Sequence, residues 1–177
     1  MAGTYKLIQA QPLASSAASV TFSSIPATYT DLVIRWSARA STSGAGYQNT
    51  KITLNGATSG SITSQTWLQN VAGSASSSRW DTSYPGYFWF EFNTPSAGWT
   101  SNTFSSYEVY LPNYAGSTQK VGSVFGAAEN NATNPYFMIA SAVKNTTTSA
   151  ISSIEIAVSS DNFVSGSSFY LYGISNA

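Results

Sequence analysis

The chain contains neither histidine nor cysteine among its 177 residues. Without imidazole and thiol groups it cannot build a Ser-His-Asp triad, a Cys-His pair or any of the common zinc sites. Disulfides are excluded as well, so the sequence neither requires nor forbids an oxidising compartment. These absences predict a protein that is not an enzyme and that has no catalytic residues, no metal site and no cofactor.

Carboxylates are the remaining candidates for catalysis, because a pair of them can hydrolyse a glycosidic bond. Four of the acidic residues could in principle pair across a groove: Asp81, Glu91, Glu108 and Glu155. They are scattered singly along the chain rather than grouped in a motif. A glycoside hydrolase, or a free-standing carbohydrate-binding module, is therefore the weakest of the functional hypotheses.

Charge is scarce as well. Charged residues make up 8% of the chain, against about 25% in an ordinary soluble domain, and seven basic residues balance seven acidic ones. Nucleic-acid binding needs a basic patch, so we expect no nucleic-acid partner. No apolar run approaches the roughly 18 residues of a membrane span, and the N-terminus lacks the apolar core of a signal peptide. We therefore expect no membrane association and a start in the cytoplasm.

Aromatic residues are plentiful instead, at 14% of the chain with 5 Trp and 11 Tyr, which argues against disorder. Apolar and polar residues alternate with period two in short segments, separated by turn sequences such as Asn55-Gly56. Roughly ten to twelve strands in a chain of this length favour two packed antiparallel sheets over a closed barrel. The sequence thus predicts one all-β domain over residues 1–177, an antiparallel two-sheet β-sandwich of jelly-roll type.

The alternation also predicts which side chains fill the core between the sheets. In "GYFWFEFNT" one face carries Phe88, Phe90 and Phe92. Regular strand positions further predict that Trp36 and Trp89 are packed. Two later segments repeat the pattern and supply the other expected core residues: Tyr107, Val109, Leu111, Ile154, Ile156 and Val158.

Two arginines, Arg35 and Arg39, share the predicted strand "DLVIRWSARA". Their spacing puts both on the strand face that points away from the core. The first interpretation is that they form ion pairs with carboxylates on neighbouring strands, drawn from Glu91, Glu108 and Glu155. The second is that they lie in an interface with a partner chain, because the guanidinium offers several donors and arginine is enriched in interfaces.

Trp80 and Trp99 are further interface candidates. Both are flanked by turn residues, in "SSSRWDTSYPGY" and "PSAGWTSN", so exposure at a loop and burial are equally compatible with the pattern. Exposed aromatic rings bind sugars or partner chains. The polar segments 43–50 and 71–78 are expected to form exposed loops.

Three passages resemble a family of structural proteins from tailed bacteriophages, cyanophages among them. They are "TYKLIQAQPLASSAASVTFSSIPATYTDLVIRWSARAS", "VYLPNYAGSTQK" and "SSFYLYGI", and they span the chain from end to end. The first is the most specific, with a short strand, a Ser/Ala turn, "VTFSSIP", a Tyr-Thr-Asp corner and a strand ending in "AR". Arg39 matches the end of that motif, and residues 171–173 match the terminal "LYG".

The resemblance implies a β-sandwich component of the virion, assembled in the host cytoplasm. The first expectation is a capsid decoration or cement protein that binds the major capsid protein or other virion proteins, because the chain lacks the repetitive sequence of a fibre shaft. The alternative is a tail-fibre or receptor-binding module that recognises a host glycan. Such proteins are commonly trimers, so a homo-oligomer is expected.

Overall fold

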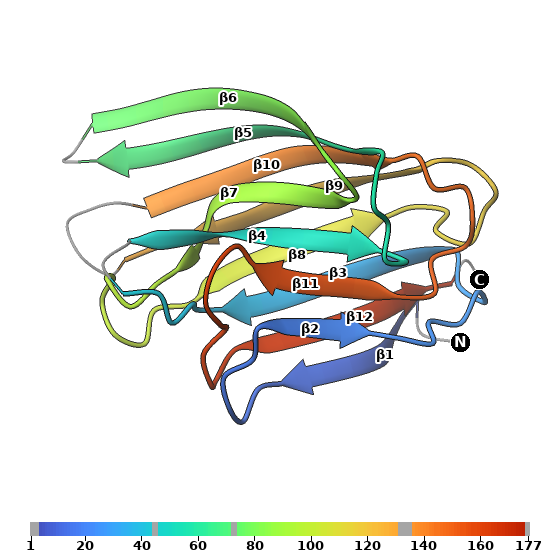
Figure 1. The fold of residues 1–177 in the computed structure, drawn as a ribbon, viewed down its shortest axis with the longest axis horizontal. Coiled ribbons are helices and arrows are strands. Elements are labelled where there is room, and N and C mark those ends of the chain that lie inside the picture. Colours follow the sequence, from blue (N-terminus) through green and yellow to red (C-terminus); the bar gives the residue numbers. More distant parts are fainter. Residues whose placement is uncertain (1–3, 44–45, 72–73, 131–135, 176–177) are drawn as a thin grey trace.

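A computed structural model describes residues 4–43, 46–71, 74–130 and 136–175, which form twelve strands (Figure 1). The larger sheet has eight strands in the order β1 (Tyr5–Pro12), β12 (Ser168–Ile174), β3 (Asp31–Ala38), β8 (Ser105–Leu111), β9 (Lys120–Ala128), β10 (Tyr136–Asn145), β5 (Ser61–Val71) and β6 (Ser74–Tyr84). The smaller sheet has four, in the order β2 (Ser19–Phe22), β11 (Ile154–Val158), β4 (Tyr47–Leu54) and β7 (Tyr87–Pro95).

All the strand pairs are antiparallel and the two sheets share one core, so the predicted all-β, two-sheet antiparallel sandwich is confirmed. The jelly-roll topology stays a prediction. The sheets are unequal, and in Figure 1 the four-stranded sheet lies in front of only part of the larger one. Strands β5 and β6 extend beyond it at the top of that view.

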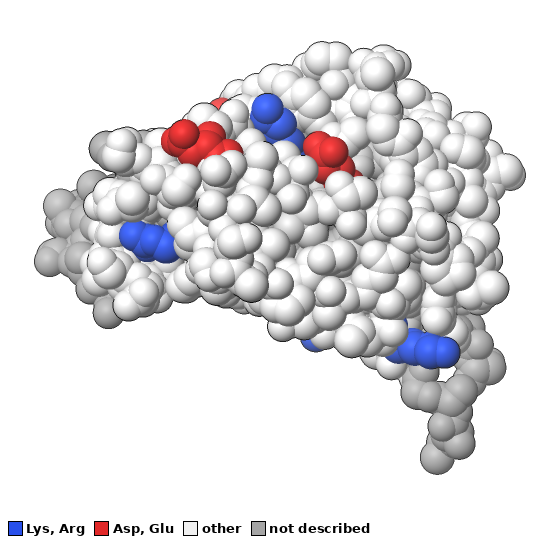
Figure 2. Space-filling model, turned by 60° about the horizontal axis from the view of Figure 1, so that its bottom comes forward, with Lys and Arg blue, Asp and Glu red and all other residues white. Residues whose placement is uncertain are grey.

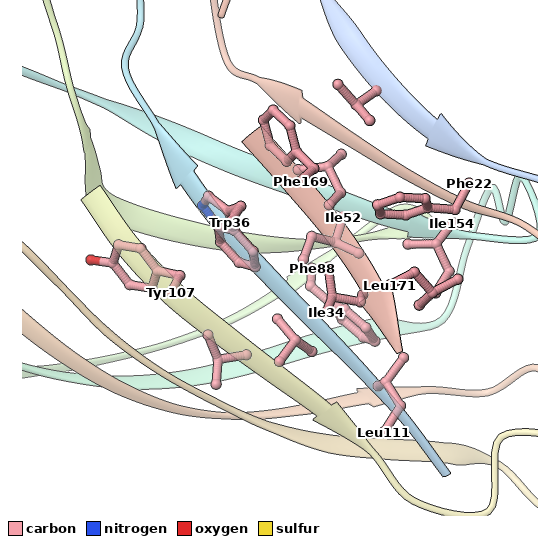
Figure 3. Close-up of a cluster of buried hydrophobic side chains, with 14 of the residues drawn as sticks. Phe22, Ile34, Trp36, Ile52, Phe88, Tyr107, Leu111, Ile154, Phe169 and Leu171 are labelled. Carbon is pink, nitrogen blue, oxygen red and sulfur yellow. The ribbon is translucent and has the colours of Figure 1, made fainter. Parts of the chain in front are cut away.

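The core between the sheets follows the alternation of the sequence (Figure 3). Phe88 and Phe90 are fully buried, and burying each side chain stabilises the fold by roughly 1.5 to 3 kcal/mol. The six residues predicted from the two later segments are buried as well. Trp36 is buried and stacks on Tyr107 with ring centroids 5.4 Å apart. The side chain of Phe92 lies outside the described part of the chain.

The two segments expected to be loops are strands over much of their length. Residues 47–50 begin β4, and residues 74–78 begin β6, where Ser78 pairs with Trp67 of β5. The serines of β6 have little apolar surface to bury, but a β-ladder is made by backbone groups, which β5 supplies along the whole strand. The expectation of loops is therefore wrong for these residues, although residues 74–78 are exposed as expected. Residues 44–45 and 72–73 lie outside the described part.

Candidate functional site

The side of the eight-stranded sheet that faces away from the four-stranded sheet is here called the outer face. It carries every large apolar side chain that is exposed among the described residues: Tyr5, Leu7, Ile62, Leu68, Val121, Phe125 and Met138. Phe125 is the most exposed, at 59%. It points outward because Val124, the residue before it on β9, is buried between the sheets. No strand or loop of the described chain covers these side chains enough to bury them.

Arg35 lies on the outer face, directly opposite Glu108 of β8. Its Nε atom is 2.6 Å from the Glu108 Oε2 atom, so the predicted cross-strand ion pair is confirmed for this arginine. The hydrogen bond to Glu108 raises the pKa of Arg35. The guanidinium carbon also lies 5.8 Å from the ring centroid of Tyr5 and 5.9 Å from that of Tyr172. The charge is thus compensated within the chain.

A shallow hollow of about 440 Å³ lies beside this ion pair. Four small residues that are paired from strand to strand across β12, β3, β8 and β9 form part of its lining: Ser168, Ser37, Ser106 and Ala127. Larger residues also line it, namely Arg35, Glu108, Phe125 and Tyr170. The outer face is therefore not flat.

Arg39 does not face outward, and that expectation is wrong. Strand β3 ends at Ala38. Beyond it, the Arg39 amide donates to the Ser167 Oγ atom at 3.2 Å, and the Ala40 amide donates to the carbonyl of Pro95 at 2.7 Å instead of continuing the ladder. The Arg39 side chain is buried, at 8% exposure, and burial lowers its pKa. Its guanidinium donates to the carbonyl oxygens of Trp99, Thr100 and Thr103 at 3.0, 2.9 and 3.1 Å. It therefore binds carbonyls, not a carboxylate.

Trp99 lies in the segment that Arg39 holds. Its ring is buried, at 5% exposure, and stacks on Phe137 with centroids 6.1 Å apart and planes 6° from parallel. The structure thus joins two of the four interface candidates, Arg39 and Trp99, inside the fold. Neither offers its side chain to the surface of a single chain, because burial removes both from contact with solvent.

A second surface of interest is a run of four half-buried rings, here called the aromatic strip: Trp80, Tyr84, Tyr87 and Trp89. The Tyr84 ring lies 5.1 Å from the Tyr87 ring and 5.0 Å from the Trp89 ring, and the Trp80 ring follows at 6.0 Å from Tyr84. The ammonium of Lys51 lies 5.5 Å from the Tyr87 ring and 5.7 Å from the Trp89 ring.

The strip forms where the chain crosses from one sheet to the other. Gly86 makes this corner with a φ of +81°, and a Cβ atom there would lie 1.9 Å from the carbonyl oxygen of Ala57. Strand β7 is then held against β5 by side chains. Thr63 accepts a hydrogen bond from the Trp89 amide at 3.1 Å, and Gln65 bonds both backbone groups of Glu91 at 3.1 and 3.2 Å. The rings of β6 and β7 consequently meet.

The sequence contained a signal for this strip that the strand-by-strand interpretation missed. In "RWDTSYPGYFW" aromatic residues stand an even number of positions apart on each side of a Pro-Gly turn, Trp80 and Tyr84 before it and Tyr87 and Trp89 after it. Trp80 was a candidate on its own, but it lies within β6 rather than at a loop. Trp89 was expected to be packed, and it packs against Tyr84 and Tyr87 in the strip, where it is half-buried.

The four candidate carboxylates are divided between opposite sides of the sandwich. Glu108 and Asp81 lie on the outer face, where Asp81 is 2.5 Å from Arg79. Glu91 and Glu155 lie on the side of the four-stranded sheet turned away from the core. In the part of the chain that the structure describes, no three His, Cys, Asp or Glu residues gather as a metal site, and no helix could cross a membrane. Figure 2 shows a surface on which charged residues are few.

Comparisons with family models, curated proteins and solved structures find no match. The outer face and the aromatic strip are therefore the two features on which we base the function. They differ in chemistry, since the outer face is broad and carries the exposed large apolar side chains of the described residues, whereas the strip is narrow, aromatic and flanked by Lys51 and Glu91.

Proposed function

We propose that this chain is a non-enzymatic structural protein of a tailed-phage virion, and within the virion a capsid decoration or cement protein. The observation that carries the proposal is the outer face, which holds all the exposed large apolar side chains of the described residues. Contiguous exposed apolar surface marks interaction sites in soluble proteins. The resemblance of three sequence passages to tailed-phage structural proteins supports the virion as the setting.

The size of the outer face suits a stable protein contact. Strands spaced about 4.8 Å apart and rising about 3.3 Å per residue give eight strands of about seven residues an area on the order of 800 Å². A standard protein interface buries about 800 Å² on each partner. The partner we propose is the outer surface of the capsid, presented by the major capsid protein.

The charge on the outer face argues for a protein partner rather than nucleic acid or lipid headgroups. Arg35 is already compensated by Glu108, and Arg79 by Asp81, while Lys144 adds a single positive charge on β10. A face without uncompensated clusters of positive charge gains little binding free energy from contacts with phosphate groups. We further propose that the chain assembles as a trimer, because closed three-fold symmetry matches three-fold positions on a capsid.

The first test is immunogold labelling of purified virions with antibody to this chain, scored by electron microscopy. Label spread over the head is the expected result. Label confined to the tail supports the tail-fibre alternative. A virion that carries no label contradicts a place in the particle altogether.

A variant test addresses the outer face itself. Phe125→Asp replaces the most exposed apolar side chain with a charged one. It should lower the affinity of the purified protein, by at least tenfold, for phage heads from which the wild-type protein is missing. Thr21→Asp is the matched control, because Thr21 is exposed on the four-stranded sheet, on the other side of the sandwich. Circular dichroism should show both variants folded. Equal binding by Phe125→Asp and wild type contradicts attachment through this face.

The second candidate function is a tail-fibre or receptor-binding module that recognises a host glycan. The aromatic strip favours it, because rings that remain partly in water are the usual platform for sugars. Trp80, one of the residues singled out from the sequence, belongs to the strip, whereas Trp99 does not.

A further inference from the structure

We infer that the aromatic strip is a binding site for a neutral carbohydrate, with a pyranose ring lying on the rings of Trp80, Tyr84, Tyr87 and Trp89. The inference does not depend on where the chain lies in the virion. It names a site and a ligand class beyond attachment to the capsid.

The rings supply the apolar part of such a site. Tyr84 is central, because its ring is within 6.0 Å of Trp80, 5.1 Å of Tyr87 and 5.0 Å of Trp89. Each of the four side chains is only half-buried, so each keeps ring surface in water. A pyranose presents a patch of C–H groups that buries well against aromatic surface, while its hydroxyls stay at the rim.

Polar groups at the edge of the strip supply the hydrogen bonds that a sugar needs. Lys51 is directly opposite Trp89 in the ladder between β4 and β7 and offers ammonium donors. Glu91 follows on the same face of β7 and offers carboxylate acceptors. Burial and, second, the neighbouring Glu91 raise the pKa of Tyr84, which indicates that the carboxylate acts on this ring. Sugar hydroxyls donate and accept, so they can use both groups.

The charges at the strip argue against other ligands that stack on aromatic rings. A quaternary ammonium group would seek the ring faces of Tyr87 and Trp89, but the Lys51 ammonium already lies 5.5 and 5.7 Å from them and would repel a second cation. Single-stranded nucleic acid needs a positively charged groove beside its stacking rings. Here one lysine is balanced by Glu91, so a neutral ligand fits best.

The strip is preorganised, because regular strands hold its rings rather than loops. Three hydrogen bonds from Thr63 and Gln65 fix β7 at Trp89 and Glu91, and the side chain of Gln65 is fully buried. A ligand therefore does not have to order a mobile segment when it binds, which favours affinity.

The position of the strip leaves it free when the outer face is occupied. Trp80 is opposite Gln65 in the ladder, so it projects from the side of β6 that faces the four-stranded sheet. Tyr87 and Trp89 project from the side of β7 turned away from the core. All three rings thus lie on the opposite side of the sandwich from Phe125. A capsid-bound chain would present the strip to the surrounding solution.

The test is a glycan array that holds neutral and acidic glycans, followed by titration of the purified full chain with the best neutral glycan. Tryptophan fluorescence follows the titration, because Trp80 and Trp89 are two of the five tryptophans that contribute to the signal. We expect binding to neutral glycans and a loss of affinity of at least tenfold in Trp80→Ala and in Tyr87→Ala. Lys51→Met keeps the apolar platform and removes only the donor, so it should weaken binding several-fold.

Phe125→Ala is the matched control, because it removes an exposed aromatic ring from the outer face instead of the strip. It should bind the glycan as wild type does. Thermal unfolding should show that every variant is folded. No binding to any neutral glycan, binding to acidic glycans alone, or binding lost in Phe125→Ala but kept in Trp80→Ala would each overturn the inference. Immunogold labelling tests the virion proposal separately, so the two can fail independently.

Discussion

Arg35 and Arg39 lie four residues apart in one segment, yet their surroundings are opposite. Arg35 is exposed in the middle of β3, and it pairs with one carboxylate, that of Glu108. Arg39 is buried just beyond the end of the strand, and it binds three backbone carbonyls of residues 99–103. The same residue type thus forms a surface ion pair in one place and buried hydrogen bonds in the other. The hydrogen bonds from Arg39 to the carbonyls of residues 99–103 are here called the brace.

The difference shows where the two-residue alternation along a strand no longer predicts the direction of a side chain. Every position of β3 from Leu32 to Ala38 has a partner on β8, so the alternation decides which face each side chain takes. After Ala38 the chain leaves this ladder, and the Ala40 amide bonds to Pro95 instead. The segment between β7 and β8 then covers Arg39. A side chain beyond the last ladder pair is placed by its tertiary contacts.

The largest expected effect is at Arg39. Arg39→Ala leaves three carbonyl groups without their donor in a largely buried site, so we expect the free energy of unfolding to fall by about 3 kcal/mol. Urea denaturation followed by tryptophan fluorescence measures it, and Trp99 should become more exposed. Arg39→Lys, which keeps the charge but not the planar fork, should recover only part of the loss. A loss below 1 kcal/mol would show that the brace is unimportant.

A smaller effect, which depends on pH, is expected at Tyr107. Its hydroxyl is buried and, unlike the Arg39 guanidinium, has no hydrogen-bond partner among the described residues. Burial raises the pKa of Tyr107 well above its usual value. The folded state therefore keeps this proton while the unfolded state loses it above about pH 10, so stability falls as pH rises beyond that point.

Tyr107→Phe removes this titration. Near neutral pH the variant should match wild type within about 1 kcal/mol, because it deletes an unpaired buried hydroxyl. Above pH 10 wild type should lose up to about 1.4 kcal/mol per pH unit more than the variant. Urea titrations at pH 7 and at pH 11 measure both quantities. Parallel losses in the two proteins at alkaline pH would contradict a raised pKa at this position.

The smallest effect is expected at Arg35. Its ion pair with Glu108 is solvent-exposed, so Arg35→Ala should lower the free energy of unfolding by only about 0.5 kcal/mol. Repeating the denaturation in about 1 M NaCl should shrink the difference, because salt screens exposed pairs. A loss as large as that of Arg39→Ala would remove the contrast between the two arginines.

Predictions from the sequence succeeded where they depended on one strand at a time. The alternation in three segments identified Phe88, Val109 and Ile156, with their neighbours on the same faces, as core residues. It left exposure and burial open for Trp99, because this residue lies outside any strand and its burial depends on Phe137 and on the brace from Arg39. The serine-rich start of β6 was missed for a related reason, since its ladder with β5 is built by backbone groups.

The candidate sites were predictable only in part. Arg35 and Trp80 do lie at the surfaces from which we argue function, and the pairing of Arg35 with a carboxylate was foreseen. Which carboxylate it would be was not, because Glu108 is 73 residues away in the chain and adjacent only in the sheet. The aromatic strip likewise needs the corner at Gly86 and the two buried side chains that hold β7 against β5.

The sequence by itself determined the all-β class, most of the core, and the lack of imidazole and thiol chemistry, because these follow from residue identity and from the two-residue period of a pleated strand. Tertiary structure alone decided that one sheet would be twice as wide as the other, that the exposed apolar side chains of distant strands would share its outer face, and that four rings from two strands would meet. Strand order and the contacts between distant segments depend on the free energy of the whole fold, and no local pattern encodes them.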